Sequence, residues 1–407
     1  MLSRTSSVVI VGGGQAGGWA AKTLRAEGFD GRIVLIGDER HPPHERPPLS
    51  KKVLAGEAAP EATHLFKPDA LDALGIEWRL GERVAGIDRP ARQVVLGRGE
   101  RIGYDKLILC TGGRARTLPL SGSDLPGVFT LRTIDDSLAI GRALQPGKRV
   151  AVVGGGWIGL EVAATARGRG AEVTVIEALP RLCERTVPSE VSRHLLELHR
   201  KHGVEVLFGA SVTSFSRRPD GAMALTVAGG RELVADVTVI GVGLVANDEL
   251  AREAGLACEN GVLVDCQCRT SDPDVLAAGD VAVAPNARLG RPVRLESWQN
   301  AQDQAIAAAK TALGQEVQYD PLPWFWSDQY DMNLQIYGFP LASHQAVIRG
   351  EIAGGSFVVF YLDAGRVQAA VGVNSARDLR FARRLIDSRK PVRAEELADE
   401  GVALAKP

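Results

Sequence analysis

Two glycine clusters in this sequence have the spacing of phosphate-binding loops. Each follows the pattern G-x-G-x-x-G, and the members are Gly12, Gly14 and Gly17 in the first cluster and Gly154, Gly156 and Gly159 in the second. The first glycine of such a loop permits a tight turn, the second lets the backbone approach a pyrophosphate, and the third lets a helix pack close to a strand. The start of that helix offers N–H donors and a positive dipole end to the phosphates. The pattern therefore predicts two dinucleotide sites.

An acidic residue ends each unit. Asp38 lies 26 residues after Gly12, and Glu177 lies 23 residues after Gly154. A carboxylate at this place accepts hydrogen bonds from the ribose hydroxyls of an adenosine. Glu177 would repel a 2′-phosphate, which predicts NADH rather than NADPH. In the first unit the acid is less clearly defined, because a glycine separates Asp38 from the strand and Glu39 follows it.

The elements that must position these residues also occur twice. The segments Val8–Asp38 and Val150–Glu177 each begin with a continuous β-branched run, which is typical of a strand buried on both faces of a parallel sheet. A helix of small residues follows, and then a second apolar strand, at Ile33–Ile36 and Val173–Ile176. A ligand-free glycine turn is a poor alternative, because the whole unit is repeated. Two different dinucleotides are expected, usually a flavin and a nicotinamide.

A later segment adds a second flavin signal. Thr270–Asp280 ends in Gly279-Asp280, where a carboxylate can accept a ribityl hydroxyl. The helix expected after it would point its N-terminus at the flavin phosphates.

Leu107–Gly113 and Val239–Gly243 are predicted strands that return the chain between domains.

Composition excludes several classes of protein. The 407 residues are enough for two or three domains, and 48 basic against 49 acidic residues leave a net charge of -1. No bulk field would attract nucleic acid or an acidic membrane. No apolar stretch approaches the ~18 residues of a transmembrane helix. We therefore expect neither nucleic acid nor a membrane as partner.

The five cysteines give no metal or disulfide pattern. Their number is odd and no pair has the C-x-x-C spacing, which fits a reducing, cytoplasmic location. His41 and His44 flank prolines, and solvent exposure is favoured over a metal site. Cys266 and Cys268 are expected to alternate on a strand and to pack.

Four further segments are more specific than the glycines. They are ERPPLSK (Glu45–Lys51), LRTIDDS around Arg132, ESWQNAQDQA (Glu296–Ala305) and PWFWSDQY (Pro323–Tyr330). With them, essentially the whole chain resembles the FAD-dependent ferredoxin–NAD(+) reductases of Rieske-type aromatic-ring dioxygenase systems, a branch of the glutathione-reductase-type flavoproteins.

The resemblance implies an α/β fold with two Rossmann-like dinucleotide-binding domains and a C-terminal α+β domain. The implied boundaries are 1–117 with 244–321 for a split FAD domain, 118–243 for an NAD domain and 322–407 for the C-terminal domain. Besides the glycines, the implied FAD contacts are Ala16, Asp38, Lys51, Val84, Arg132, Asp280 and Trp298.

The resemblance also places a catalytic pair, Lys51 and Glu161, at the N5 edge of the flavin; a structural salt bridge between the two predicted domains is the alternative. Trp157 is expected to cover the nicotinamide pocket, with plain burial as the competing interpretation. Two departures concern stacking at the flavin: many relatives have Tyr at Trp157 and a smaller residue at Trp298.

The missing thiol indicates the electron acceptor. Disulfide reductases and NADH oxidases of this fold carry cysteine after the first unit, but this chain has none between Asp38 and Gly81. Electrons must then leave singly, which suits an iron–sulfur protein. The resemblance implies an NADH:ferredoxin oxidoreductase that reduces a 2Fe-2S ferredoxin and serves, indirectly, a Rieske oxygenase. An NADH oxidase, a disulfide reductase and a non-catalytic redox-sensing flavoprotein are the alternatives.

A basic helix near the C-terminus is the predicted ferredoxin site. Arg377, Arg380 and Arg384 have i, i+3, i+7 spacing and share one helix face. Trp324 and Trp326 alternate, as residues on one face of a strand do, and either pack in a core or lie between the docked cluster and the flavin. A solvated basic face is the simpler alternative.

Overall fold

The computed structural model of this chain describes residues 2–402 and 404. They form two compact units. The first unit combines Met1–Pro47, Ala59–Arg114 and Leu244–Pro321. The second unit combines Pro48–Ala58, Ala115–Gly243 and Leu322–Pro407. The predicted three-domain boundaries stay a prediction.

A five-stranded parallel sheet organises the first unit, in the order β19-β7-β1-β2-β3. Its strands are β1 (Ser7–Val11), β2 (Arg32–Gly37), β3 (Glu77–Leu80), β7 (Lys106–Leu109) and β19 (Val275–Ala277). Alternate residues of β1 enter two different cores, Val8 and Ile10 on one side and Val9 and Val11 on the other. Both faces of β1 are therefore covered, which explains its continuous apolar run.

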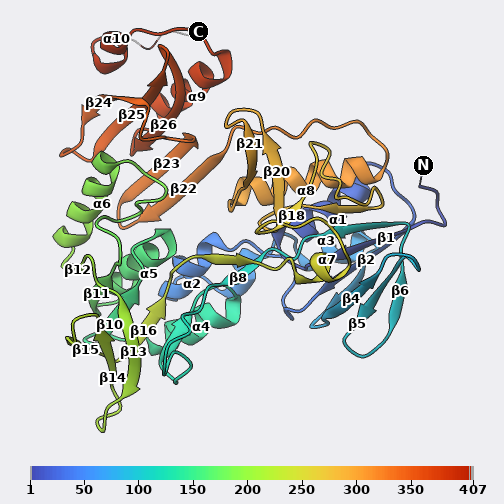
Figure 1. Cartoon of the computed structure of the whole chain (residues 1–407), viewed down its shortest axis with the longest axis horizontal. Coiled ribbons are helices and arrows are strands. Elements are labelled where there is room, and N and C mark those ends of the chain that lie inside the picture. The colour runs from blue at the N-terminus through green and yellow to red at the C-terminus, as the bar shows by residue number, and fades with distance from the viewer. Residues whose placement is uncertain (1, 403, 405–407) are drawn as a thin grey trace. The chain divides into compact units, whose positions relative to one another are not determined.

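Helices and two small sheets complete this unit. Helices α1 (Gln15–Ala26) and α8 (Trp298–Ala312) pack side by side (Figure 1). The small sheets are β4-β5-β6 (Val84–Asp88, Gln93–Leu96, Arg101–Gly103) and β18-β20-β21 (Val262–Leu263, Ala282–Asn286, Arg291–Arg294).

The second unit repeats the arrangement with the strand order β12-β11-β10-β16-β9, again parallel. The strands are β9 (Val128–Thr130), β10 (Arg149–Val153), β11 (Glu172–Ile176), β12 (Glu205–Leu207) and β16 (Val237–Ile240). Its helices are α2 (Lys52–Ala55), α4 (Ile134–Ala143), α5 (Trp157–Gly168) and α6 (Ser189–Lys201). An antiparallel sheet, β13-β14-β15 (Val212–Arg217, Met223–Val227, Glu232–Ala235), is also part of this unit.

The C-terminal part of the second unit is an antiparallel sheet in the order β22-β23-β26-β25-β24, followed by two helices. The bounds are β22 (Trp324–Gln329), β23 (Met332–Gly338), β24 (Gln345–Glu351), β25 (Ser356–Asp363), β26 (Arg366–Val373), α9 (Ala376–Ser388) and α10 (Ala394–Ala398). On β25, Val358 and Phe360 pack with α9, whereas Phe357 and Tyr361 join the core that contains α6. The predicted fold class is confirmed.

The expected strand through Cys266 and Cys268 is wrong. Both residues lie in a turn, and the backbone of Cys268 has a φ of +63°. The cause is Asp265, whose Oδ1 accepts the backbone N–H groups of Gln267 at 2.8 Å and Arg269 at 2.9 Å. Such an Asx turn competes with strand pairing. Packing is confirmed only for Cys268, which is fully buried.

In the described part of the chain, no helix combines the length and the apolar character needed to cross a membrane.

Candidate active site

The first glycine loop connects β1 to α1 and is shaped by steric limits. Gly12 has a φ of +118°, and a Cβ there would lie 2.1 Å from the carbonyl oxygen of Cys110. A Cβ on Gly17 would lie 1.9 Å from the carbonyl oxygen of Gly12. At Gly14 the nearest atom is 3.7 Å away, on Arg46. The first and third glycines are thus needed for packing, and the second faces open space.

The second loop, between β10 and α5, repeats this geometry. A Cβ on Gly154 would lie 2.4 Å from the carbonyl oxygen of Gly241, and one on Gly159 would lie 2.0 Å from that of Gly154. Nothing lies within 4 Å of a Cβ on Gly156. Both loops therefore leave space at the position where a pyrophosphate must approach the backbone.

Both helices that follow the loops begin without a side-chain cap. Gly14 and Gly156 are the N-cap residues, and the first turns of α1 and α5 contain no acidic residue. The first N–H groups of a helix need partners from outside it, and phosphate oxygens suit them. The residues present thus fit a bound dinucleotide in each unit.

The predicted ribose acid of the second unit is firmly held. Glu177 follows β11 directly, and its Oε2 accepts the N–H of Gly155 at 2.6 Å. Its Oε1 accepts the N–H of Leu179 at 2.7 Å. These backbone bonds orient the carboxylate at the glycine loop, where its predicted role toward NAD needs it.

The first unit has no acid at the equivalent position. Val11 pairs with Ile36 as Val153 pairs with Ile176, so the residue that corresponds to Glu177 is Gly37. A Cβ on Gly37 would lie 2.9 Å from the Cα of the loop residue Gly13, which leaves no room for a side chain. The predicted Asp38 lies one residue further and is exposed.

Three other predicted FAD residues gather near the first loop. The Cβ of Ala16 lies 3.0 Å from a Cβ built on Gly279, which precedes Asp280. Gln15, at the start of α1, donates its side-chain Nε2–H to the carbonyl oxygen of Trp298 at 2.9 Å. The N-termini of α1 and α8 therefore lie close together beside the Gly279-Asp280 turn.

Asp38 follows β2, and Val84 is the first residue of β4 in a separate small sheet. Glu82 donates its N–H to the carbonyl oxygen of Gly37 at 2.9 Å, which places the segment before β4 next to the end of β2. The side chain of Val84 is buried in the core, so only its backbone could face a ligand. The FAD roles of both residues stay predictions.

Arg46 is a residue that the sequence interpretation missed. Its Nη2 lies 3.7 Å from a Cβ built on Gly14 and forms an ion pair of 2.6 Å with Glu39. A guanidinium at the open glycine can bind pyrophosphate oxygens. The signal for it in the sequence is its place in the ERPPLSK segment, which also contains Lys51.

Arg46→Ala is expected to weaken FAD binding about tenfold, because the variant could not make the charge-assisted hydrogen bond to phosphate that Arg46 is placed to form. FAD retention after gel filtration and titration of the apoprotein would measure the effect. Arg98→Ala, in an exposed turn of the same unit, is the control. Equal FAD affinity of both variants would rule out a phosphate contact by Arg46.

The structure brings the predicted catalytic pair together in the second unit. Lys51 Nζ lies 2.8 Å from Glu161 Oε1, and the Glu161 side chain is only 4% exposed. Glu161 also accepts the hydroxyl of Ser50 at 2.5 Å and that of Ser327 at 2.6 Å. A buried carboxylate is tolerated when such partners compensate its lost hydration. Lys51 follows the 3-10 turn Pro47–Ser50.

Two further predicted residues lie in this unit. Arg132 precedes α4 and donates its backbone N–H to Asp136 Oδ2 at 3.0 Å. Trp157 begins α5 and is half-buried, with its ring 4.9 Å from that of Phe325. Contact with FAD for Arg132 and cover of the nicotinamide pocket for Trp157 stay predictions.

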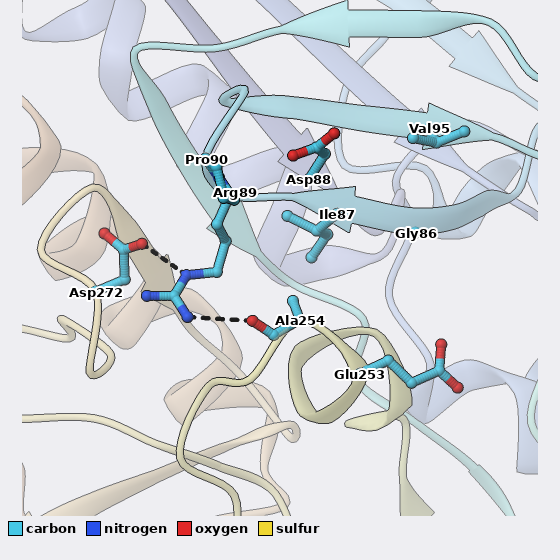
Figure 2. Close-up of a pocket in the computed structure, with 9 residues that line it drawn as sticks. All are labelled: Gly86, Ile87, Asp88, Arg89, Pro90, Val95, Glu253, Ala254 and Asp272. Carbon is cyan, nitrogen blue, oxygen red and sulfur yellow. Dashed lines mark hydrogen bonds and ion pairs between the residues drawn. The ribbon is translucent and has the colours of Figure 1, made fainter.

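A surface hollow of about 780 Å³ lies in the first unit, but none of the residues predicted to bind a cofactor or to take part in catalysis lines it. Figure 2 shows Arg89 turned toward Asp272 and Ala254 in this hollow. The Arg89 Nε lies 2.8 Å from Asp272, and Nη1 donates to the Ala254 carbonyl at 3.1 Å. Because the guanidinium is already bound by protein groups, we assign the hollow no ligand.

The described residues contain no group of three His, Cys, Asp or Glu side chains that could hold a metal ion. Burial lowers the pKa of His44 to about 4, so this residue is a neutral internal histidine and not the exposed one expected. All five cysteines are free thiols, and burial raises the pKa of Cys110 to about 12.

Two open glycine loops and a buried Lys–Glu pair define a two-dinucleotide flavoprotein oxidoreductase. Residues 6–305 match the family model described as pyridine nucleotide-disulphide oxidoreductase, and residues 324–407 match that of the reductase C-terminal domain. The chain belongs to the pyridine nucleotide-disulphide oxidoreductase family and, within it, to the ferredoxin–NAD(+) reductases. Its cofactors are FAD and NAD(H), as predicted.

Similar proteins match along their whole length. The chain is 43% identical to the ferredoxin–NAD(+) reductase component of an anthranilate 1,2-dioxygenase system from Burkholderia cepacia, over 97% of this chain and 98% of the relative. It is 39% identical to putidaredoxin reductase from Pseudomonas putida, over 99% of this chain and 97% of the relative. A solved complex of putidaredoxin reductase with putidaredoxin superposes with a TM-score of 0.94 at 39% identity, covering 99% of this chain and 98% of that one.

Proposed function

We propose that this enzyme transfers electrons from NADH to a 2Fe-2S ferredoxin, which supplies a Rieske-type aromatic-ring dioxygenase. The observation that carries the proposal is the pair of open glycine loops, each followed by an uncapped helix. The similarity to the anthranilate dioxygenase component supports the oxygenase assignment. We also propose a cytoplasmic location, because five free thiols fit a reducing compartment.

The proposed reaction balances as one NADH against two ferredoxins. NADH loses a hydride and becomes NAD(+), two oxidised ferredoxins each gain one electron, and one proton is released. Bound FAD supplies the conversion between a two-electron donor and one-electron acceptors.

We propose that the chain's own residues bind and orient the cofactors in this reaction. The backbones of Gly14 and Gly156 would approach the pyrophosphates, Glu177 would accept the NADH ribose hydroxyls, and Arg132 would contact FAD. Glu161 holds the ammonium of Lys51 in place. A fixed cation beside the reacting cofactor would favour the negative charge that arrives with hydride.

The direct experiment is an assay with purified holoenzyme. NADH-driven reduction of cytochrome c is expected to require an added two-iron ferredoxin, and NADPH is expected to be a poor donor. Rapid NADH oxidation by O2 in the absence of ferredoxin would favour an oxidase instead, and rapid cytochrome c reduction without ferredoxin would contradict the proposed need for this partner.

We propose that the ferredoxin docks on α9. Arg377, Arg380 and Arg384 are all exposed, whereas Leu379 and Leu385 on the opposite side are buried. Complementary charge of this kind steers encounter and sets orientation more than it adds affinity. Iron–sulfur ferredoxins are usually acidic, which suits this basic face.

The acidic residues of α9 do not cancel the charge of this face. Asp378 pairs with Arg349 of β24 at 3.1 Å, and Asp387 pairs with Arg383 at 3.8 Å. Each acid is therefore matched by an arginine outside the basic face.

An aromatic row adjoins the docking helix. The rings of Trp324 and Trp326 stack on one face of β22 at 4.8 Å, and Tyr337 lies 6.3 Å from Trp324. The Arg383 guanidinium lies 5.6 Å above Tyr337 and so joins the row to α9. We propose that this row lies beneath the docked ferredoxin.

Reversing two arginines to give Arg380→Glu/Arg384→Glu is expected to raise the KM for ferredoxin about tenfold at low salt and to flatten its salt dependence. Reduction of the flavin by NADH should not change. The matched control is Arg193→Glu/Arg200→Glu, two exposed arginines on α6. If both double variants have the wild-type KM, the ferredoxin docks elsewhere.

A further inference from the structure

A chain of buried hydrogen bonds connects Glu161 to the C-terminal sheet and to α6. Ser327 donates its hydroxyl to Glu161 Oε1 at 2.6 Å, and Gln329 donates Nε2–H to Ser327 Oγ at 3.0 Å. His199 Nε2 lies 2.8 Å from Gln329 Oε1, and the Tyr330 hydroxyl lies 3.3 Å from His199 Nδ1. Glu161, Ser327, Gln329 and His199 are each buried.

The donor and acceptor groups give this chain of hydrogen bonds a single direction. The Glu161 carboxylate can only accept, so Ser327 uses its single proton there and must accept from the amide of Gln329. The other end of that amide is an oxygen, which requires a proton on His199 Nε2. Burial lowers the pKa of His199 to about 4, so the ring is neutral and its Nδ1 accepts from Tyr330. Every donor therefore points toward Glu161.

The turn between β22 and β23 holds Tyr330, the residue at the end of the hydrogen-bond chain that is farthest from Glu161. Tyr330 has a φ of +55°, which a residue other than glycine rarely adopts. Its ring stacks on His202, with centroids 3.6 Å apart and planes within 7°. This stacking keeps the hydroxyl of Tyr330 at His199.

The strand β22 has two faces with different contacts. Phe325, Ser327 and Gln329 face α5 and α6, where they contact Trp157, Glu161 and His199 in turn. Trp324 and Trp326 lie on the opposite face, because side chains alternate along a strand. The same strand thus carries the aromatic row outside and supports the Lys51–Glu161 pair inside.

We propose that Ser327, Gln329 and His199 are positioning residues that fix the orientation of the Glu161 carboxylate, and so hold Lys51 at one place beside the flavin. Aligned donors strengthen one another, and a buried anion depends on them. The inference rests on the proposed function of Lys51. A proton path is the weaker interpretation, because the Gln329 amide would have to pass through an unstable imidic form.

The first test compares Ser327→Ala with Ser327→Thr, which keeps the hydroxyl. Ser327→Ala is expected to slow single-turnover reduction of the flavin by NADH about tenfold, with FAD content and NADH affinity unchanged. Ser327→Thr should recover most of the rate. The control is Ser356→Ala, an exposed serine of the same sheet. A wild-type rate in Ser327→Ala, or equal slowing in both Ser327 variants, would overturn the proposal.

The second test needs no variant and therefore does not depend on its folding. In wild-type holoenzyme with 15N-labelled histidine, NMR is expected to show His199 neutral with its proton on Nε2. A proton on Nδ1, or on both nitrogens at neutral pH, would overturn the proposal. Failure of the proposed function is a separate result: wild-type enzyme would then not reduce ferredoxin, whatever the tautomer of His199.

Discussion

Lys51→Met is expected to slow reduction of the bound flavin by NADH about a hundredfold, a loss typical of removing one preorganised electrostatic group. The ammonium of Lys51 lies 2.8 Å from a Glu161 carboxylate that is 4% exposed. Methionine keeps the apolar length of the side chain and removes its charge. The uncompensated anion would then oppose the negative charge that hydride transfer brings.

Stopped-flow bleaching of the flavin by NADH measures this rate, and the visible spectrum measures FAD content. Lys52→Met is the matched control, because Lys52 is the adjacent lysine and is exposed. If Lys51 serves only as a salt bridge between the start of α2 and α5, the melting temperature of Lys51→Met should fall while its single-turnover rate equals that of Lys52→Met. That result would remove the catalytic role.

The parallel sheets and glycine loops could be predicted because their causes are local in the sequence. β1 and β10 are covered on both faces, so their apolar runs are continuous. At the loops, a Cβ on the first or third glycine would overlap backbone atoms, so only glycine fits there and its presence indicates the close packing. The helix of α9 was predictable for the same reason, since its buried and basic residues follow the helical period.

Other features depend on contacts between distant segments. Ser327 lies 166 residues from Glu161, and no periodicity connects them. The difference between the two predicted ribose acids depends on strand register, which places Gly37 where the second unit has Glu177. Asp265 accepts two backbone N–H groups with its side chain, and the resulting turn replaces the strand that the alternating residues around Cys266 predicted. Lys51 and Glu161 were paired only through the family resemblance.

Glu177→Arg is expected to shift the ratio of kcat/KM for NADH over NADPH at least about a hundredfold toward NADPH. A carboxylate suited to ribose hydroxyls would become a guanidinium suited to a 2′-phosphate, and each charge-assisted bond is worth about 1.5–3 kcal/mol. The carboxylate also binds the N–H groups of Gly155 and Leu179. Because losing these bonds loosens the loop, both coenzymes should react more slowly, and the ratio is the informative quantity.

Arg181 is not expected to assist this switch. Its Nη1 donates to the carbonyl of Val187 at 2.5 Å and its Nη2 to that of Glu184 at 2.9 Å, so the guanidinium is bound to backbone in its present position. Glu184→Arg, with the same change of charge near the loop, should leave the coenzyme ratio unchanged. Glu177→Gln should lower kcat/KM for NADH and raise kcat/KM for NADPH only slightly, because an amide still accepts hydrogen bonds but offers no cation. An unchanged ratio in Glu177→Arg would mean that another residue reads the ribose.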